Sequence, residues 1–259
     1  QNYAITESHE PGSTFKLVDL IAVLDDKKAD TSKIYDSKGG VIEYYGRKVR
    51  DSKPGGYGKI SLARGFELSS NTVLVQSVYD SYKNNPKQFV DRINSYGLNK
   101  PLGLPIKGEG KPVIPQPGTN RWSGVALPWM AFGYGLSVTP LQTLTLYNAV
   151  ANDGVMVKPI FVSEIKEWNK TIKKYNTEVI NPKICSQETL DKVQAVLENV
   201  VKRGTGSKLY SKDFSMAGKT GTAQVNYKDK SKLYYASSFV GYFPADEPKY
   251  SCIVVVHKP

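Results

Sequence analysis

The sequence is poor in cysteine and histidine and has no long apolar run, and each shortage excludes a class of protein. Two Cys in 259 residues cannot form a disulfide framework, and two His and two Cys, each pair far apart in sequence, do not indicate a zinc site. No stretch approaches the ~20 consecutive apolar residues of a membrane span. We therefore expect a globular domain without a metal site or a cofactor.

The two cysteines are expected to be structural and unreactive. Cys252 lies in the apolar run 251–256 and is predicted to be a buried small hydrophobic residue. Cys185 precedes the start of a predicted helix and carries no motif around it. A Cys185–Cys252 disulfide is the less favoured alternative, because a chain with so few cysteines need not pair them.

The net charge of +11 raises the question of an anionic partner. The lysines are dispersed, and the densest groups lie in stretches that look like exposed loops or hairpins. No zinc finger, recognition helix or aromatic RNA-binding signature accompanies them. We therefore interpret the charge as a solvated basic face and predict no nucleic-acid partner; the two lysine groups are Lys170, Lys173 and Lys174, and Lys228, Lys230 and Lys232.

Helical periodicity dominates the first two thirds of the chain, and strand patterns dominate the last third. Ser and Thr residues stand where helix N-caps are expected, and Asn, Gly and Pro follow the helical runs. A Gly- and Pro-rich stretch, 99–124, is predicted to be a long loop. Helices are expected over 12–25, 61–68, 71–82, up to 96, 140–152 and 186–202.

Strands are expected in three parts of the chain. A hairpin is predicted over 34–49 with its turn at 38–40, and two or three short strands over 155–175. The runs 214–224, 235–243 and 249–257 have tight connections and predict an antiparallel meander. The sequence thus predicts an α+β fold, with helices in the middle of the chain and a sheet at its end.

Ser13-Thr14-Phe15-Lys16 is the first of three short polar motifs that carry chemistry. Three residues apart on a helix, Ser13 and Lys16 share one face. A serine hydroxyl becomes a good nucleophile only when a base removes its proton, and Lys16 is within reach to do so. A lysine can act as a base only if burial or a nearby cation, for which Lys219 is a candidate, lowers its pKa. Taken alone, the motif is better explained by a helix cap and a surface lysine, because this spacing of Ser and Lys often occurs by chance.

Ser69-Ser70-Asn71 is the second motif and lies between two predicted helices. Ser69 could relay a proton to a leaving amine, and Asn71 could hydrogen-bond a substrate amide together with Lys16. Taken alone, this motif is better explained as an ordinary N-cap, since Ser and Asn are common caps.

Lys219-Thr220-Gly221-Thr222 is the third motif and lies on a predicted strand. An ammonium and two hydroxyls suit a carboxylate ligand, and a glycine in a strand often marks close approach of a ligand backbone. A phosphate-binding loop is excluded, because its first required glycine would fall on Asp213 and the flanking residues predict a strand.

Together, in this order, the three motifs resemble those of penicillin-binding proteins and serine β-lactamases. The segments around them are similar to class B penicillin-binding proteins, and 133–142 looks like the division branch of that family. The resemblance extends over the whole chain; the segments that carry it are 10–16, 133–142, 204–206, 217–224, 238–244 and 257–259.

The resemblance implies a D,D-transpeptidase that cross-links peptidoglycan stem peptides through an acyl-enzyme on Ser13. It implies Lys16 as the base, Ser69 and Lys219 as the proton path to the leaving amine, and Asn71 as a ligand of the substrate amide. Lys219, Thr220 and Thr222 would bind the D-Ala-D-Ala carboxylate end, and Gly221 would be a further substrate-binding residue. The backbone N–H groups of Ser13 and Thr222 would form the oxyanion hole.

The same resemblance implies the fold and the setting of the protein. The fold would be an antiparallel sheet covered by helices plus a helical lobe, with about three of the family's usual five strands. We expect one domain over 1–259, with a helical lobe at about 26–150 and a sheet lobe at about 154–259 that includes the 12–25 helix. The strands missing from the sheet would leave its apolar faces uncovered.

The resemblance also implies a membrane anchor outside these residues, an extracytoplasmic location, β-lactam binding and divisome partners.

Three alternatives remain open at this stage. The chain could serve in elongation, it could be a serine β-lactamase, or it could be a β-lactam sensor without catalysis. A class A β-lactamase needs a Glu-x-x-x-Asn pattern to activate water, and Glu164 and Glu167 near Asn169 do not match it. Trp122, Trp129 and Tyr134 could line a polymer groove, but most of such large aromatics belong to the core.

Overall fold

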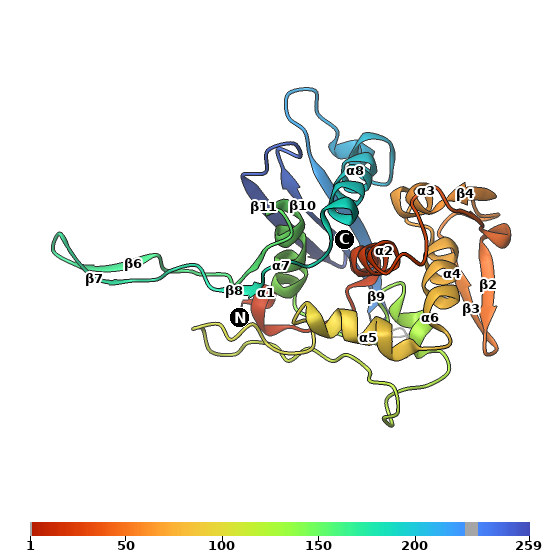
Figure 1. The fold of residues 1–259 in the computed structure, drawn as a ribbon, viewed down its shortest axis with the longest axis horizontal. Helices are drawn as coiled ribbons and strands as arrows, with labels where there is room; N and C mark the ends of the chain where they lie inside the picture. The colour runs from red at the N-terminus through yellow and green to blue at the C-terminus, as the bar shows by residue number, and fades with distance from the viewer. Residues whose placement is uncertain (1, 226–232) are drawn as a thin grey trace.

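The computed structural model describes residues 2–225 and 233–259 and has the predicted α+β architecture (Figure 1). Lys228, Lys230 and Lys232 lie outside the described residues. Among the described helices, none combines the length and the apolar character required to cross a membrane.

The helices agree with the periodicity of the sequence, and their caps explain where they begin. Thr139 forms a capping box with Gln142 at the start of α7, and Ser61, Ser70 and Ser186 accept N-cap hydrogen bonds from α3, α4 and α8. The long loop predicted at 99–124 contains no helix or strand. The α-helices are α1 Tyr3–Thr6, α2 Lys16–Asp25, α3 Leu62–Glu67, α4 Asn71–Tyr82, α5 Pro86–Ser95, α6 Ala126–Met130, α7 Pro140–Ala151 and α8 Gln187–Arg203.

Helix α2 runs through the centre of the molecule and is buried on all sides (Figure 1). Nine of its ten residues, from Lys16 to Leu24, are buried, including the polar Lys16 and Asp19. A 3₁₀ turn, η1 Gly12–Phe15, leads into it and carries Ser13. The surrounding helices α4, α5 and α8 each contact α2, so the first motif is fixed from several directions.

The C-terminal strands form the predicted antiparallel meander. Strands β9 Ala217–Val225, β10 Tyr234–Phe243 and β11 Tyr250–His257 pair in the order β11-β10-β9. Helix α8 packs on β9, while α7 packs on β10 and β11. The side chains of Ala217, Lys219, Val240 and Tyr242 are buried on the covered face.

The opposite face of this sheet carries exposed apolar side chains. Alternation along a strand places Cys252, Val254 and Val256 on that face together with Tyr235 and Tyr250. All five are exposed, and both cysteines are free. The prediction that Cys252 is buried was therefore wrong: an apolar run indicated burial on both faces, but β11 is an edge strand covered on one face only.

Two short antiparallel pairs lie beside the helices, and one of them corrects a prediction. Strands β1 Ile34–Asp36 and β4 Lys59–Ser61 pair, and β2 Val41–Tyr44 pairs with β3 Arg47–Arg50. The hairpin turn is thus Tyr45-Gly46, both at positive φ, and not 38–40. Residues 38–40 form a 3₁₀ turn instead, because Gly40 packs its backbone against Gly56, where a Cβ would lie 2.8 Å from the Gly56 nitrogen.

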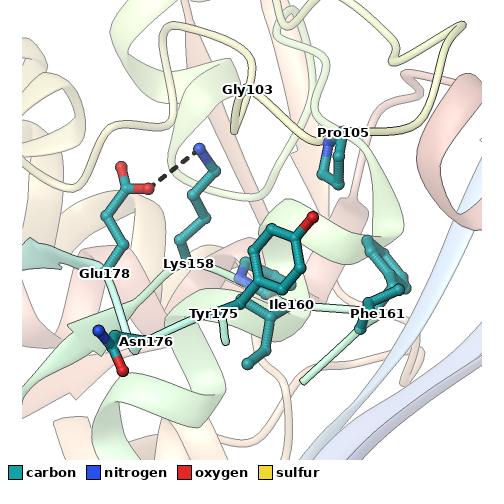
Figure 2. A pocket seen from close by; sticks show the side chains of 10 residues that line it. Gly103, Pro105, Lys158, Ile160, Phe161, Tyr175, Asn176 and Glu178 are labelled. Carbon is teal, nitrogen blue, oxygen red and sulfur yellow. Dashed lines mark hydrogen bonds and ion pairs between the residues drawn. The ribbon is translucent and has the colours of Figure 1, made fainter. Parts of the chain in front are cut away.

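The remaining strands belong to an arm that projects far from the body of the molecule (Figure 1). Strands β6 Glu164–Glu167 and β7 Lys170–Lys174 form it, next to the short pair β5 Met156–Val157 and β8 Val179–Asn181. A cavity of about 290 Å³ lies at its base, where Tyr175 stands over Ile160 beside the Lys158–Glu178 ion pair (Figure 2). No residue of the three motifs lines this cavity, so it is not the candidate site.

Candidate functional site

The three motifs, whose outermost residues Ser13 and Thr222 are 209 positions apart in sequence, meet at one cavity. It has a volume of about 450 Å³ and is open on one side. Members of every motif line it, and further hydroxyl groups come from the loop after α8 and from β10. The lining residues are Ser13, Ser52, Ser69, Asn71, Thr205, Thr220, Gly221, Thr222, Ser237 and Ser238.

Ser13 lies in the first turn before α2, pressed against strand β9. A Cβ on Gly12 would lie 3.2 Å from Ala223 Cβ, and Gly12 has a φ of +57°, so glycine permits this close approach. Tyr147 Oη donates a 2.8 Å hydrogen bond to the Thr14 carbonyl and anchors the turn from α7. Ser13 is thereby held at the edge of the sheet next to Thr222.

Lys16 is fully buried beneath the cavity and joins the first motif to the second. Its Nζ donates to the Ser69 carbonyl at 2.8 Å and to Asn71 Oδ1 at 2.6 Å, and it lies 3.3 Å from Ser69 Oγ. Burial lowers the pKa of Lys16 to about 7, against the opposing charges of Asp19 and Asp51. Burial is therefore the principal cause of the shift required of a base.

The direct hydrogen bond expected between Lys16 and Ser13 stays a prediction. Within residues 2–225 and 233–259 the structure records no hydrogen bond of the Ser13 hydroxyl. Catalytic hydrogen bonds are often long before substrate binds, so this does not exclude the pair.

Asp19 is a buried acid one turn after Lys16 on α2. Neither of its carboxyl oxygens has a hydrogen-bond partner among the described residues. Burial raises the pKa of Asp19 well above its usual value, because an ionised carboxylate without partners is strongly disfavoured in the core. Lys16 and Asp19 are thus both shifted toward their neutral forms.

The second motif is held in place by the end of the β2–β3 hairpin. Asp51 accepts hydrogen bonds from the Thr72 backbone N–H at 2.9 Å and from the Ser70 hydroxyl at 3.1 Å. Asn71 Nδ2 donates to the Arg50 carbonyl at 2.7 Å. Ser70 is the N-cap of α4, so both predicted interpretations of this motif have a structural counterpart.

Ser69 has a backbone conformation that is uncommon for a residue with a side chain. Its φ is +56°, in the left-handed region that favours glycine. Its N–H bonds to the Phe66 carbonyl and its carbonyl bonds to Lys16, which together hold it there. Such strain often marks a functional position, and here it directs the Ser69 hydroxyl toward the cavity.

Lys219, the first residue of the third motif, is fully buried on the covered face of the sheet. Its Nζ donates to the Thr220 carbonyl at 3.0 Å and lies 5.7 Å from the centre of the Phe66 ring. Burial, followed by the charge of Lys16, lowers the pKa of Lys219 well below its usual value. An arriving carboxylate would favour the protonated form and restore the charge.

Gly221 lines the cavity, and it also permits close packing between β9 and its neighbours. A Cβ there would lie 2.4 Å from Ser238 Oγ and 3.0 Å from Thr14 Cγ2. The glycine therefore lets β9 approach the turn that carries Ser13. Thr222 is exposed, whereas Thr220 is partly buried and shares a 2.5 Å hydrogen bond with Thr205 Oγ1.

A second cavity, of about 320 Å³, shares Ser13, Asn71 and Thr222 with the first. Aromatic side chains form its far side, and Tyr134 Oη accepts a 2.9 Å hydrogen bond from the Gln224 N–H. Trp129 and Tyr134 thus line this cavity, while Trp122 and Trp129 pack against the hydrophobic core, as favoured from the sequence. The other residues that line the cavity are Lys48, Val49, Arg50, Phe132 and Gln224.

Several lining residues were not predicted from the sequence. Ser52 and Ser237 reach the cavity only through the pairing of distant segments, and no local motif distinguishes them. Thr205 lies in the 204–206 segment that carries the family resemblance, but the sequence alone assigns it no role. Among the described residues, no group of three or more His, Cys, Asp or Glu side chains is placed to hold a metal ion.

The chain matches the family model described as the penicillin binding protein transpeptidase domain over residues 1–259. Among curated proteins it is 31% identical to stage V sporulation protein D of Bacillus subtilis, over 100% of this chain and 40% of that protein. It is 27% identical to the peptidoglycan D,D-transpeptidase FtsI of Escherichia coli, over 100% of this chain and 41% of that protein. The chain thus spans about two fifths of these relatives.

Solved structures agree with the sequence comparisons. The penicillin-binding protein 3 of Mycobacterium tuberculosis, complexed with aztreonam, superposes with a TM-score of 0.87 at 28% identity. The match covers 100% of this chain and 58% of that one. The fold and the family predicted from the three motifs are confirmed.

Proposed function

The chain belongs to the penicillin-binding protein transpeptidase family, and on this premise we propose that it cross-links peptidoglycan by acyl transfer through Ser13. The observation that carries the proposal is the position of Lys16. Its buried amine, with a pKa near 7, bridges to Ser69 and Asn71 beneath a cavity that Ser13, Ser69 and Thr220 line together. This arrangement supplies a nucleophile, a base and a proton relay at one place.

In the proposed first step, Ser13 Oγ attacks the carbonyl carbon of the penultimate D-Ala of a donor stem peptide. The hydroxyl proton moves to neutral Lys16, whose two N–H bonds are already directed at the Ser69 carbonyl and Asn71 Oδ1. Backbone N–H groups of Ser13 and Thr222 would stabilise the oxyanion, a donor of this kind contributing ~3–4 kcal/mol.

Collapse of this intermediate breaks the amide C–N bond, and the terminal D-Ala leaves as an amine. Ser69 Oγ, 3.3 Å from Lys16 Nζ, would pass the proton to that amine. Lys219 would take part in the same proton path. Lys219, Thr220 and Thr222 would bind the terminal carboxylate, and Asn71 the donor amide. An acceptor amine then attacks the ester, and the proton returns to Ser13 Oγ.

A β-lactam would enter the same cycle as a mimic of the donor. Its ring amide would open on attack by Ser13 and leave a slowly hydrolysed ester. The described residues that line the two cavities around Ser13 include no carboxylate to activate water. Glu164 and Glu167 lie on the projecting arm, so the geometry favours transfer to an amine over hydrolysis.

We also propose the setting that the resemblance implies. The domain would work at the extracytoplasmic face of the cytoplasmic membrane, as part of a longer, membrane-anchored protein in septal wall synthesis. Divisome membrane proteins would be its partners. The support is membership of the family, together with the similarity to FtsI.

Mass spectrometry after treatment with penicillin tests the acyl-transfer proposal. We expect one adduct, on Ser13, in the wild type, and none in Ser13→Ala. Labelling of Ser13→Ala at the wild-type rate would overturn the assignment. Ser52→Ala, which removes another hydroxyl from the same cavity, is the matched control and should label normally.

Turnover separates the proposed enzyme from its alternatives. A transpeptidase should consume a D-Ala thioester donor faster when an amine acceptor is added. A non-catalytic sensor would acylate with penicillin but leave the thioester intact, and a β-lactamase would hydrolyse a chromogenic cephalosporin in many rapid cycles.

A further inference from the structure

Glu67, the last residue of α3, is a buried carboxylate that the proposed reaction does not use. Its side chain is 0% exposed and lies between two arginines that are 35% and 61% exposed. Arg203 makes two parallel contacts with it, Nη2 to Oε1 at 2.8 Å and Nε to Oε2 at 3.1 Å. Arg64 Nη1 adds a third at 2.8 Å. A forked guanidinium–carboxylate pair of this kind fixes geometry as well as charge.

The backbones around this ion pair are joined as well. The Thr205 N–H donates to the Glu67 carbonyl at 3.0 Å, and Arg64 Nη1 donates to the Arg203 carbonyl at 3.1 Å. A Cβ on Gly204 would lie 2.4 Å from the Glu67 carbonyl oxygen, so only glycine permits this contact. The end of α3 and the end of α8 are therefore held together as one unit.

Each of the two helix ends in this unit is followed within two residues by a residue that lines the cavity. Glu67 is two residues before Ser69, and Arg203 is two residues before Thr205. Thr205 Oγ1 in turn shares a 2.5 Å hydrogen bond with Thr220 Oγ1. When Thr205 donates this bond, the hydrogen of the Thr220 hydroxyl is left to donate to a ligand.

We infer that Glu67 is a positioning residue that sets Thr205 against Thr220, and that Thr205 is a further residue recognising the carboxylate of the donor. The inference rests on the proposed acyl transfer. Glu67 itself touches no substrate and acts through Arg203 and the Thr205 backbone. Losing it should therefore affect recognition of the carboxylate more than the chemistry at Ser13.

A pair of thioester donors tests this inference, one ending in a carboxylate and its counterpart ending in a carboxamide. The wild type should prefer the carboxylate in kcat/KM. We expect Glu67→Gln and Thr205→Val each to reduce this preference about tenfold, mainly through KM for the carboxylate donor. Thr205→Ser, which keeps the hydroxyl, should retain it.

Lys202→Ala is the matched control for Arg203→Ala, because it removes an exposed ion pair with Glu198 from the neighbouring position of α8. Arg203→Ala should lose the preference and Lys202→Ala should keep it.

An unchanged preference in Thr205→Val, which leaves the ion pair intact, would overturn the role of Thr205. An equal loss for both donors in Glu67→Gln would reduce Glu67 to a structural residue. A wild type that turns over neither donor would instead refute the acyl-transfer proposal.

Discussion

The two sides of the cavity hold their lysines in different ways. On the helical side, formed by α2 and the α3–α4 junction, Lys16 Nζ has three oxygen neighbours within 3.3 Å. On the sheet side, formed by β9, Lys219 Nζ donates among the described residues only to the Thr220 carbonyl. The difference supports the proposed roles of the two lysines, proton transfer for Lys16 and binding of the donor carboxylate for Lys219, because Lys219 Nζ keeps donor capacity for a ligand.

Among the changes considered, replacing Lys16 by methionine on the helical side should slow acylation the most. The change keeps a buried chain of similar length but removes the base, and general-base catalysis contributes about 10²–10⁴-fold. We expect acylation by a fluorescent penicillin to slow by that factor, measured by stopped flow. Lys83→Met, at the exposed C-cap of α4, should acylate normally. A loss of less than about threefold in Lys16→Met would remove Lys16 as the base.

Replacing Lys219 by methionine on the sheet side should have a smaller effect, a loss in kcat/KM for the donor. A hydrogen bond to a charged group contributes about 1.5–3 kcal/mol, which corresponds to roughly 10–100-fold in kcat/KM. We expect this loss for the carboxylate-ended donor and a much smaller one for its carboxamide counterpart. Equal losses for both donors would place Lys219 in proton transfer alone.

The pH dependence of acylation sharpens the comparison, because only the helical lysine must be neutral for the first step. The pKa of Lys16 is lowered to about 7, so the active form accumulates as the pH rises through that value. The acylation rate should therefore rise with pH, falling about tenfold per unit below pH 7 and levelling above it. A rate that falls as the pH rises from 6 to 8 would contradict a neutral Lys16.

Asp51→Asn should have the smallest effect and act on the helical side alone. The substitution weakens the N-cap contacts with Ser70 and Thr72, at a cost of about 1 kcal/mol in the free energy of unfolding. It also removes a charge that raises the pKa of Lys16, so the midpoint of the acylation profile should move to lower pH. Urea unfolding and the same pH series measure both; a midpoint moved to higher pH would contradict the assignment.

The parts of the fold that depend on local chemistry could be predicted from the sequence. Helix α4 was placed at its correct bounds because Ser70 caps it and its apolar residues recur at helical spacing. The 38–40 turn and Cys252 were misjudged because strand partners and covered faces are decided by distant segments. The β2–β3 turn was missed because Tyr45 adopts a positive φ that its residue type does not favour.

The residues of the candidate site also differ in whether the sequence alone could predict them. Each motif could be found locally, since its residues lie within a few positions of one another and carry complementary chemistry. Glu67 and Arg203 are 136 positions apart, and their ion pair depends on the packing of α3 against α8. The only local signal was the spacing of Arg64 and Glu67, which is ordinary on a solvated helix.

The tip of the projecting arm has a practical consequence for measurement. Trp168 is 95% exposed, whereas Trp129 lines the second cavity beside Ser13. In Trp168→Phe, the emission of an indole in bulk water would disappear while the cavity stays untouched. Trp129 would then dominate any change in intrinsic fluorescence at the cavity, so acylation of Ser13 could be followed with unlabelled β-lactams.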